Sequence, residues 1–333
     1  MTAIWTLRLL AIEAIAMAAT LTLALDMYAH KRVEALGGVN FWGYRGPVAP
    51  QRQRNEIRVA LVGGTRAFGW GQSGTALVGE IRRLILLTTD QRGGELRPVV
   101  TINLGRPGAL PDSYPATIEH YSYLQPDYIC LYDDLGVRGS SAADDRSGVF
   151  ELTGYAPALP LVLREKGLIW RFGDVKRGYG SAQSQHGAAP SVLRRGAGSM
   201  LEGAGDVLGA ADRFVARIVV SRSRETSPRV DGAASYADAM MTAVDTAHRR
   251  ARGVVVVVSP SETPEQVANA RALEIQLQKA LASAAWLRFV DLRTETALYD
   301  DALRVDGWNY GGTGTALVAE RMTPAVLSLI GKP

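Results

Sequence analysis

The sequence predicts an α/β protein in which a parallel sheet lies between two layers of helices and follows one N-terminal transmembrane helix. Three observations lead to this prediction. The run Ile57 to Gln72 has the pattern of a buried strand that ends in a glycine turn and continues into a helix. Further apolar runs alternate with segments of helical spacing, and Gly253 to Ser259 contains an unbroken valine run. Near the N-terminus, Leu9 to Tyr28 is almost entirely apolar.

The composition fits a globular domain and argues against several kinds of site. The chain has 333 residues, of which 47% are hydrophobic, and this is ample for a packed core. The net charge is +4 without a dense basic block that includes aromatic residues, so we expect no nucleic-acid partner. Cys130 is the single cysteine and is expected to be a small core residue. The histidines, His30, His120, His186 and His248, lack ligand spacing, and we expect no metal and no cofactor.

The apolar run near the N-terminus has the ~20 residues that a helix needs to cross a bilayer. Glu13 lies inside this run and Asp26 near its end. Because a carboxyl group at membrane depth is costly, it more often faces another protein segment than lipid. Three small residues, Ala11, Ala14 and Ala18, are candidates for close packing against a partner helix. The alternative is a lipid-facing helix with a partly neutralised Glu13 at the interface.

We expect an anchor with its flank at residues 1–34, an extended linker at 35–56, and an α/β domain at 57–333 with an irregular insertion at about 138–232. Strands are expected at Arg58–Val62, Pro98–Leu104, Asp127–Tyr132, Gly253–Ser259 and Leu287–Asp291. Helices are expected at Gly74–Thr89, Pro115–Leu124, Leu201–Ser221, Ala233–Arg250, Thr263–Ala282 and Thr313–Leu329. Pro264 suits the first turn of its helix, since proline there removes no needed donor.

The insertion has two parts. Phe150 to Phe172 is apolar and basic, and we expect it to lie against a membrane or a partner. Gly173 to Gly198 is rich in glycine, serine, alanine and glutamine and is expected to be a long loop.

Two motifs, GYRGP at Gly43 to Pro47 and GGTRAFGWG at Gly63 to Gly71, give the chain from Asn40 to Gln72 a family resemblance. This stretch resembles the start of membrane-anchored SGNH (GDSL-type) hydrolases. That family reads G-D-S-x-T-F-G-W-G here, with serine as the nucleophile, whereas this chain has Gly64 and Thr65 in place of the Asp and Ser. The resemblance implies a three-layer, flavodoxin-like sheet to the C-terminus and a domain displayed in the periplasm.

The resemblance also implies positions for the remaining site residues. Gly105, in the run Asn103 to Gly108, matches the family's second block, whose glycine N–H binds the oxyanion; an ordinary strand-ending turn is the equal alternative. In the third block, G-x-N-D, Gly136 stands where the family has the oxyanion asparagine. A two-residue slip would offer Asp134 instead, whose negative charge would repel an oxyanion.

The family's last block is D-x-x-H, in which the histidine is the general base. Asp306 is retained, and Asn309 replaces the histidine. An amide has no useful proton affinity near pH 7, so it cannot accept a hydroxyl proton as imidazole does. With nucleophile, base and oxyanion asparagine all changed, the pattern predicts a pseudoenzyme. Activation of Thr65 by another group, such as His186, is the alternative.

These observations favour a non-catalytic, membrane-anchored accessory subunit of a larger bacterial membrane protein complex, in the cytoplasmic (inner) membrane. The partners would be that complex, through the N-terminal helix and the domain surface, and the bilayer itself. Photosynthetic, respiratory and secretion complexes all use such chains, and we favour a photosynthetic reaction-centre or light-harvesting assembly. The first alternative is a residual esterase or O-acyltransferase that acts on envelope acyl esters through Thr65. The second is a binding module that keeps a carbohydrate or acyl ligand in the former pocket. The basic residues Lys31 and Arg32 after the anchor, against Arg8 before it, favour instead a cytoplasmic domain.

Overall fold

The computed structural model describes residues 2–35, 38–69, 76–91, 93, 97–106, 109–133, 135, 149, 153, 155, 157–172, 191–220, 233–304 and 309–331. These residues belong to two compact units. One unit comprises 1–35, 39–43 and 146–224, and the other comprises 36–38, 44–145 and 225–333. In this division the described residues of the insertion group with the anchor helix.

The second unit is built on a parallel sheet of five strands in the order β2-β1-β3-β4-β5. The strands are β1 (Ile57–Gly63), β2 (Val99–Asn103), β3 (Tyr128–Asp133), β4 (Gly253–Val258) and β5 (Leu287–Asp291). All five predicted strands are present, and β1, β3 and β4 are buried along their whole length. The order is that of flavodoxin-like sheets, which confirms the predicted fold class.

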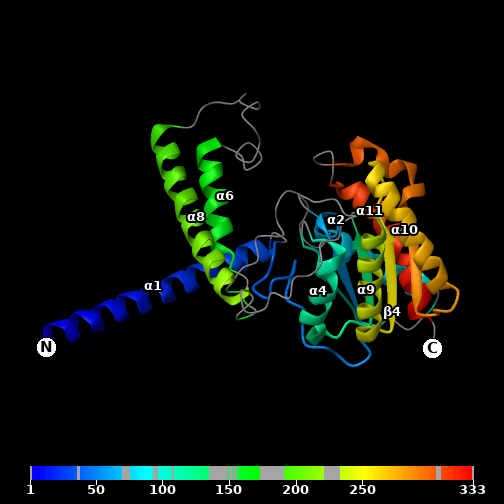
Figure 1. Ribbon diagram of the computed structural model, residues 1–333, viewed down its shortest axis with the longest axis horizontal. Helices are drawn as coiled ribbons and strands as arrows, with labels where there is room; N and C mark the ends of the chain where they lie inside the picture. The colour runs from blue at the N-terminus through cyan, green and yellow to red at the C-terminus, as the bar shows by residue number, and fades with distance from the viewer. Residues whose placement is uncertain are drawn as a thin grey trace. The chain divides into compact units, whose positions relative to one another are not determined.

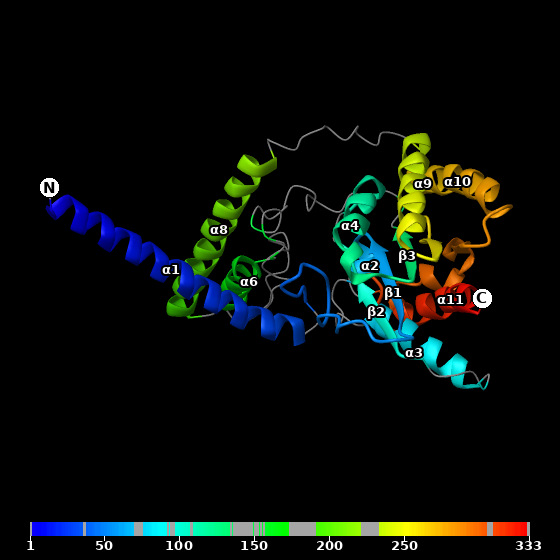
Figure 2. The ribbon, with the colours of Figure 1, turned by 90° about the horizontal axis from the view of Figure 1, so that it is seen from below.

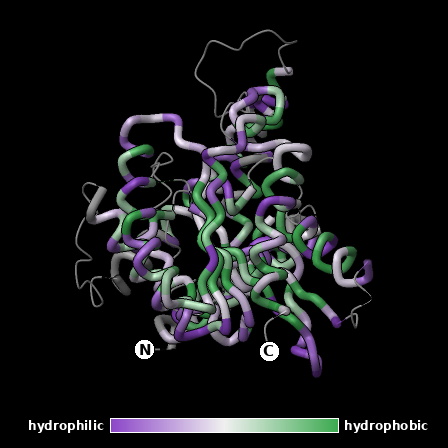
Figure 3. Tube along the Cα trace, turned by 90° about the vertical axis from the view of Figure 1, so that its right-hand side faces the viewer, coloured by the Kyte–Doolittle hydropathy of each residue, from purple (hydrophilic) through white to green (hydrophobic). Residues whose placement is uncertain are grey.

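Helices cover both faces of this sheet (Figures 1 and 2). The helices α3 (Ala76–Gln91) and α11 (Gly312–Ile330) pack together on one face. The other face carries α4 (Tyr114–His120), α9 (Ala233–Arg250) and α10 (Pro264–Leu281). The strands lie between these layers and are mostly hydrophobic, as Figure 3 shows. Cys130 lies fully buried in this core, as predicted.

Local signals in the sequence explain where several elements begin. The helix α10 starts with a capping box, in which the Thr263 side chain accepts from the Gln266 N–H and Pro264 occupies the first turn. Short 3-10 turns follow the strands and helices at η1 (Pro111–Ser113), η2 (Ser122–Leu124), η4 (Leu292–Thr294), η5 (Thr296–Tyr299) and η6 (Asp301–Leu303). The predicted helix Pro115–Leu124 is therefore a shorter α-helix followed by a 3-10 turn.

Residues 38–56, the part of the predicted linker that the structure describes after α1, contain no helix and no long strand, and those from residue 44 on are packed against the rest of the α/β unit. Tyr44 and Arg45 are buried, and Arg45 forms an isolated antiparallel bridge with Asn103. Arg52 donates two hydrogen bonds of 2.8 Å to the Asp127 carboxylate. Residues 44–56 therefore belong to the α/β unit.

The first unit contains α1 (Thr2–Ala35), α6 (Leu159–Phe172) and α8 (Val192–Val220). Within α1, Arg8–Lys31 is long and apolar enough to cross a membrane, and only 6% of its apolar window is buried. The expected loop Gly173–Gly198 is wrong in its last part, since α8 already begins at Val192; residues 173–190 lie outside the described residues. Glycines suggested the loop, but Gly198 is buried against α6, where a small residue is needed.

Asp26 connects α1 with the start of α6. Its carboxylate accepts hydrogen bonds from the Ala158 N–H at 2.9 Å, from the Leu159 N–H and from the Tyr155 hydroxyl. The His30 Nε2 atom lies 3.4 Å from the same carboxylate. A negative charge at a helix N-terminus satisfies backbone donors and is favoured by the helix dipole. Asp26 therefore faces protein, as expected for a carboxyl group near the end of the apolar run, whereas Glu13 is exposed.

Candidate functional site

The turn after β1 has the strand-turn-helix geometry that the sequence predicts. Thr65 begins α2 (Thr65–Phe68) at the carboxyl end of β1 and is half-buried. A Cβ atom at Gly63 would lie 1.9 Å from the Tyr132 carbonyl oxygen, so only glycine fits between the two strands. Gly69 ends the short helix with a φ of 73°, which favours glycine. The chain thus presents Thr65 at the sheet edge where ligands commonly bind.

The backbone N–H of Gly105 is engaged within the chain. It donates to the Asn103 Oδ1 atom at 2.9 Å, while Asn103 Nδ2 donates to the Ala67 carbonyl at 2.9 Å. A Cβ atom at Gly105 would lie 2.5 Å from the Phe68 nitrogen, so this glycine packs directly against α2. The sequence alone predicts no role for the Asn103 side chain, although Asn103 begins the run that matches the family's second block. In the structure its amide joins Gly105 to α2 and occupies the donor that an oxyanion would need.

The end of β3 is tied to helices on the same side of the sheet. The buried Asp133 carboxylate accepts hydrogen bonds from the hydroxyls of Tyr114 and Tyr236 and from the Leu135 N–H. The Ser259 hydroxyl donates to the Asp133 carbonyl at 2.7 Å. Gly136 and Asp134 lie outside the described residues. No pattern in the sequence predicts this cluster, because Tyr236 is 103 residues away from Asp133.

Beside Thr65, two buried guanidinium groups share one carboxylate. Arg66 Nη2 lies 2.9 Å and Arg304 Nη2 3.0 Å from Glu262 Oε1. The side chains of Arg66 and Arg304 are 0% and 6% exposed, against 23% for Glu262. Because a buried charge is stable only when paired, these residues form a fixed structural unit at the sheet edge. Sequence reasoning missed all three; the charged residue directly after Thr65 was the only local signal.

Asn309 lies at the same edge. Arg304 and Tyr310 form an isolated antiparallel bridge, so the buried Asn309 sits in the turn before α11. The Arg66 guanidinium lies 5.3 Å from the centre of the Tyr310 ring. Burial, the largest cause, raises the pKa of Tyr310, and the nearby Arg66 and Arg304 oppose the rise. Arg66 and Tyr310, the residues that follow the expected nucleophile Thr65 and the expected base position Asn309, therefore contact each other. Asp306 and His186 lie outside the described residues.

A further buried cation lies on the other side of α2. The Arg45 guanidinium donates to the carbonyls of Phe68 and Gly69 and lies 4.4 Å from the Phe68 ring centre. Burial lowers the pKa of Arg45 to about 10. Together with Arg66 and Arg304, it makes the described part of this edge rich in arginine.

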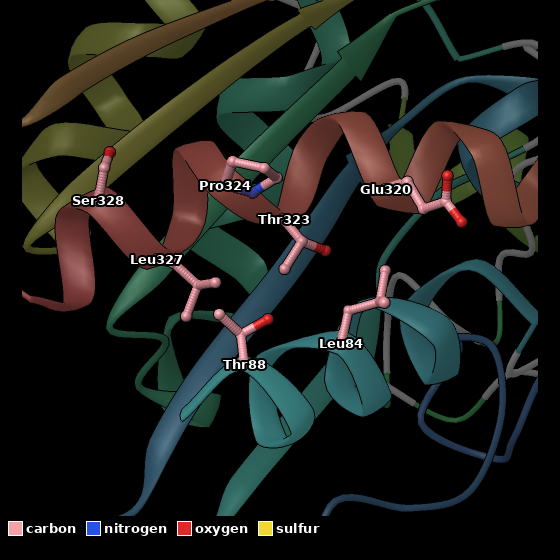
Figure 4. Close-up of a pocket in the computed structure, with 7 residues that line it drawn as sticks. All are labelled: Leu84, Thr88, Glu320, Thr323, Pro324, Leu327 and Ser328. Carbon is pink, nitrogen blue, oxygen red and sulfur yellow. The ribbon is translucent and has the colours of Figure 1, made fainter. Parts of the chain in front are cut away.

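No group of acidic, cysteine and histidine side chains that could hold a metal ion occurs in the described part of the chain. A pocket of about 260 Å³ lies elsewhere, between α3 and α11, and is not part of the sheet edge (Figure 4). Leu84 and Thr88 line it from α3, and residues near Pro324 line it from α11. It contains none of the site residues predicted from the sequence.

No family model matches the chain, and no curated protein matches it. Solved structures do resemble it. The lipase/acylhydrolase from Enterococcus faecalis is 12% identical with a TM-score of 0.41, over 81% of this chain and 95% of that one. An acetyl xylan esterase from Geobacillus stearothermophilus is 12% identical with a TM-score of 0.42, over 83% and 94%. A G-D-S-L family protein from Desulfitobacterium hafniense is 10% identical with a TM-score of 0.40, over 80% and 98%.

These structural neighbours are a lipase/acylhydrolase, an acetyl xylan esterase and a lipolytic protein of the G-D-S-L family, all at low sequence identity. Matches of this strength say nothing of the activity of this chain. Its fold class rests on the order and direction of the five strands.

Proposed function

We propose that this chain is a non-catalytic, membrane-anchored accessory subunit of a larger bacterial membrane protein complex, with its hydrolase-like domain as a scaffold. The observation that carries the proposal is Asn309, which stands where the resembling hydrolases have their histidine base. Without a group that accepts a proton near pH 7, a hydroxyl nucleophile stays unreactive.

Two contacts support the loss of catalysis. The Gly105 N–H donates to Asn103, so binding an oxyanion there would require breaking this hydrogen bond. The Arg66–Glu262–Arg304 cluster fixes the residues around Thr65 in ion pairs of their own. A site that stabilised developing charge would instead aim its donors at an open position.

The catalytic part of the proposal is tested with purified full-length chain in detergent. Short acyl esters and acetylated xylan are offered to the wild type and to Thr65→Ala, in which the hydroxyl is absent. We expect that neither protein hydrolyses these esters faster than buffer without protein does. Hydrolysis by the wild type that disappears in Thr65→Ala would establish the alternative, a residual esterase or O-acyltransferase. That alternative draws support from Thr65 itself, which lies half-buried at the nucleophile position.

The anchor supports the accessory role. Glu13 lies within the candidate span and makes no ion pair or hydrogen bond with the described residues. On a helix with 3.6 residues per turn, Ala11, Ala14 and Ala18 lie roughly 100–160° around the axis from Glu13. The carboxylate and the alanine seam therefore face different directions. A helix placed between two neighbours would use both faces.

The complex is identified by extraction of native membranes in mild detergent, followed by sizing and mass spectrometry. We expect the chain to travel with a stoichiometric membrane complex. If that complex is the photosynthetic assembly that we favour, its pigment absorption will travel with the chain. Recovery of the chain alone would contradict the accessory role.

A further inference from the structure

The helix α8 contains the triplet Gly-Ala-Gly twice, at 196–198 and 203–205. The last glycine of each triplet packs on α6. A Cβ atom at Gly198 would lie 2.8 Å from the Gly167 carbonyl oxygen, and one at Gly205 would lie 2.7 Å from the Pro160 carbonyl oxygen. The first glycines, Gly196 and Gly203, have no described atom within 4 Å of such a Cβ. Glycine inside an exposed helix is destabilising relative to alanine, so contacts within the chain do not explain these two positions.

The same side of α8 carries large apolar residues at intervals of seven. Leu193, Met200, Val207 and Phe214 are 87%, 79%, 69% and 63% exposed. With 3.6 residues per turn, they share with the first glycines and with Ala210 an uncharged face roughly 100° wide. This face points away from the glycines that contact α6. The pattern of one large and one small residue per heptad is typical of helices that pack closely against another helix.

We propose that this face of α8 pairs with the same face of a second copy of the chain, in antiparallel orientation about a two-fold axis. One register places three of the four large residues over small ones, while Phe214 lies beyond the first residue of the second copy's α8. Leu193 then lies opposite Ala210 of the second copy, Met200 opposite its Gly203, and Val207 opposite its Gly196. The exposed glycines receive the same close approach that their neighbours Gly198 and Gly205 already have from α6.

One pair of charges beside this face fits the same register. Arg195 and Asp206 lie on one flank of the face, and within the chain Asp206 also lies 3.8 Å from the Arg164 Nε atom. In an antiparallel two-fold pair this flank meets its own equivalent. Arg195 then comes beside Asp206 of the second copy with an axial offset of about 3 Å, at 1.5 Å per residue.

A second copy also fits the anchor. In both views α8 runs steeply across the direction of α1 (Figures 1 and 2). A two-fold axis parallel to α1 therefore makes two α8 helices antiparallel while both anchors cross one membrane in the same direction. A lipid surface would cover the large apolar residues equally well, but contact with lipid does not require glycine at fixed intervals. This inference does not depend on the proposed accessory role, since the partner is a second copy of the chain.

The first test compares full-length variants in detergent by multi-angle light scattering. Gly203→Leu fills the small position that Met200 of the second copy would cover, and in the single chain nothing described lies near it. The matched control is Gly312→Leu, at the first residue of α11, which also has open space. We expect dimers for the wild type and the control, and monomers with unchanged helix content for Gly203→Leu. A monomeric wild type, or a dimeric Gly203→Leu, would overturn the proposal.

The second test measures the orientation with spin labels on single introduced cysteines in lipid nanodiscs. Cys130 does not compete, because it is fully buried and burial raises the pKa of its thiol to about 12. At 1.5 Å per residue, the antiparallel register predicts axial separations of about 17 Å for Val207→Cys, 26 Å for Leu193→Cys and 38 Å for Phe214→Cys. Equal separations at all three sites would mean a parallel pair. If the labels show no dipolar coupling, and if oxygen reaches them while a water-soluble nickel complex does not, this face of α8 is covered by lipid. Either result overturns the proposal.

Discussion

At the sheet edge, two side chains make long-range contacts beside the predicted site positions Thr65 and Gly105. Asn103 receives the hydrogen bond of the Gly105 N–H, and Arg66 turns from the position after Thr65 towards Glu262. Neither contact is visible in the sequence. Arg66 and Glu262 are separated by 196 residues, and neither periodicity nor motif links them. The sequence therefore predicts which catalytic residues are replaced, whereas the contacts that Asn103 and Arg66 make are seen only in the structure.

The Glu262 carboxylate is expected to be a main source of stability at this edge. Glu262→Gln removes the charge shared by Arg66 and Arg304, whose side chains are 0% and 6% exposed. Removing one partner of a buried ion pair leaves uncompensated charge. Since Glu262 is partly exposed, we expect a loss of about 2 kcal/mol in the free energy of unfolding. Urea unfolding of the full-length chain in detergent measures it.

Glu295→Gln is the matched control for this change. Glu295 pairs with Arg321, whose side chain is 48% exposed, so solvent screens the pair. We expect a loss below about 1 kcal/mol. Equal losses in the two variants would mean that the buried cluster contributes no more than a surface pair.

At the scale of elements, the strands were the most predictable parts. Strands buried on both faces of a parallel sheet are continuous apolar runs, and Gly253 to Val258 is such a run. The start of α10 was equally readable, because Thr263, Pro264 and Gln266 form a local cap. The start of α8 was not. Its glycines have low helix propensity, and only the α6 backbone lying against Gly198 shows why they are there.

The contact between α6 and α8 should therefore depend on Gly205. Gly205→Ala places a methyl group 2.7 Å from the Pro160 carbonyl oxygen and 2.8 Å from the Arg164 nitrogen, so the helices must separate. We expect a loss of about 1–3 kcal/mol in the stability of this helix pair. Hydrogen exchange of the α6 amides in the full-length chain measures it. Ser199→Ala, on an exposed position of α8, should leave exchange slowed or unchanged. Faster exchange in both variants would contradict a specific role for Gly205.

For the whole molecule, the described residues of the insertion group with α1 in one compact unit. Asp26 is one residue that joins them, because its carboxylate accepts from the Ala158 N–H. No sequence motif links Asp26 to Ala158, because the two are 132 residues apart. The α/β unit retains the predicted strand order without the insertion.

Two arguments predict opposite sides of the membrane for the domain that follows α1. Lys31 and Arg32 directly after the span favour retention in the cytoplasm, whereas the family resemblance places the domain in the periplasm. We expect the periplasmic orientation, in which an added protease digests the C-terminal domain in spheroplasts while a cytoplasmic marker survives. Lys31→Gln with Arg32→Gln removes the opposing charges, so it should keep this orientation or increase the digested fraction. Suppose that the wild-type domain is digested only after lysis, whereas the domain of the double variant is digested in intact spheroplasts. The charges would then determine the orientation, and the periplasmic assignment would be wrong.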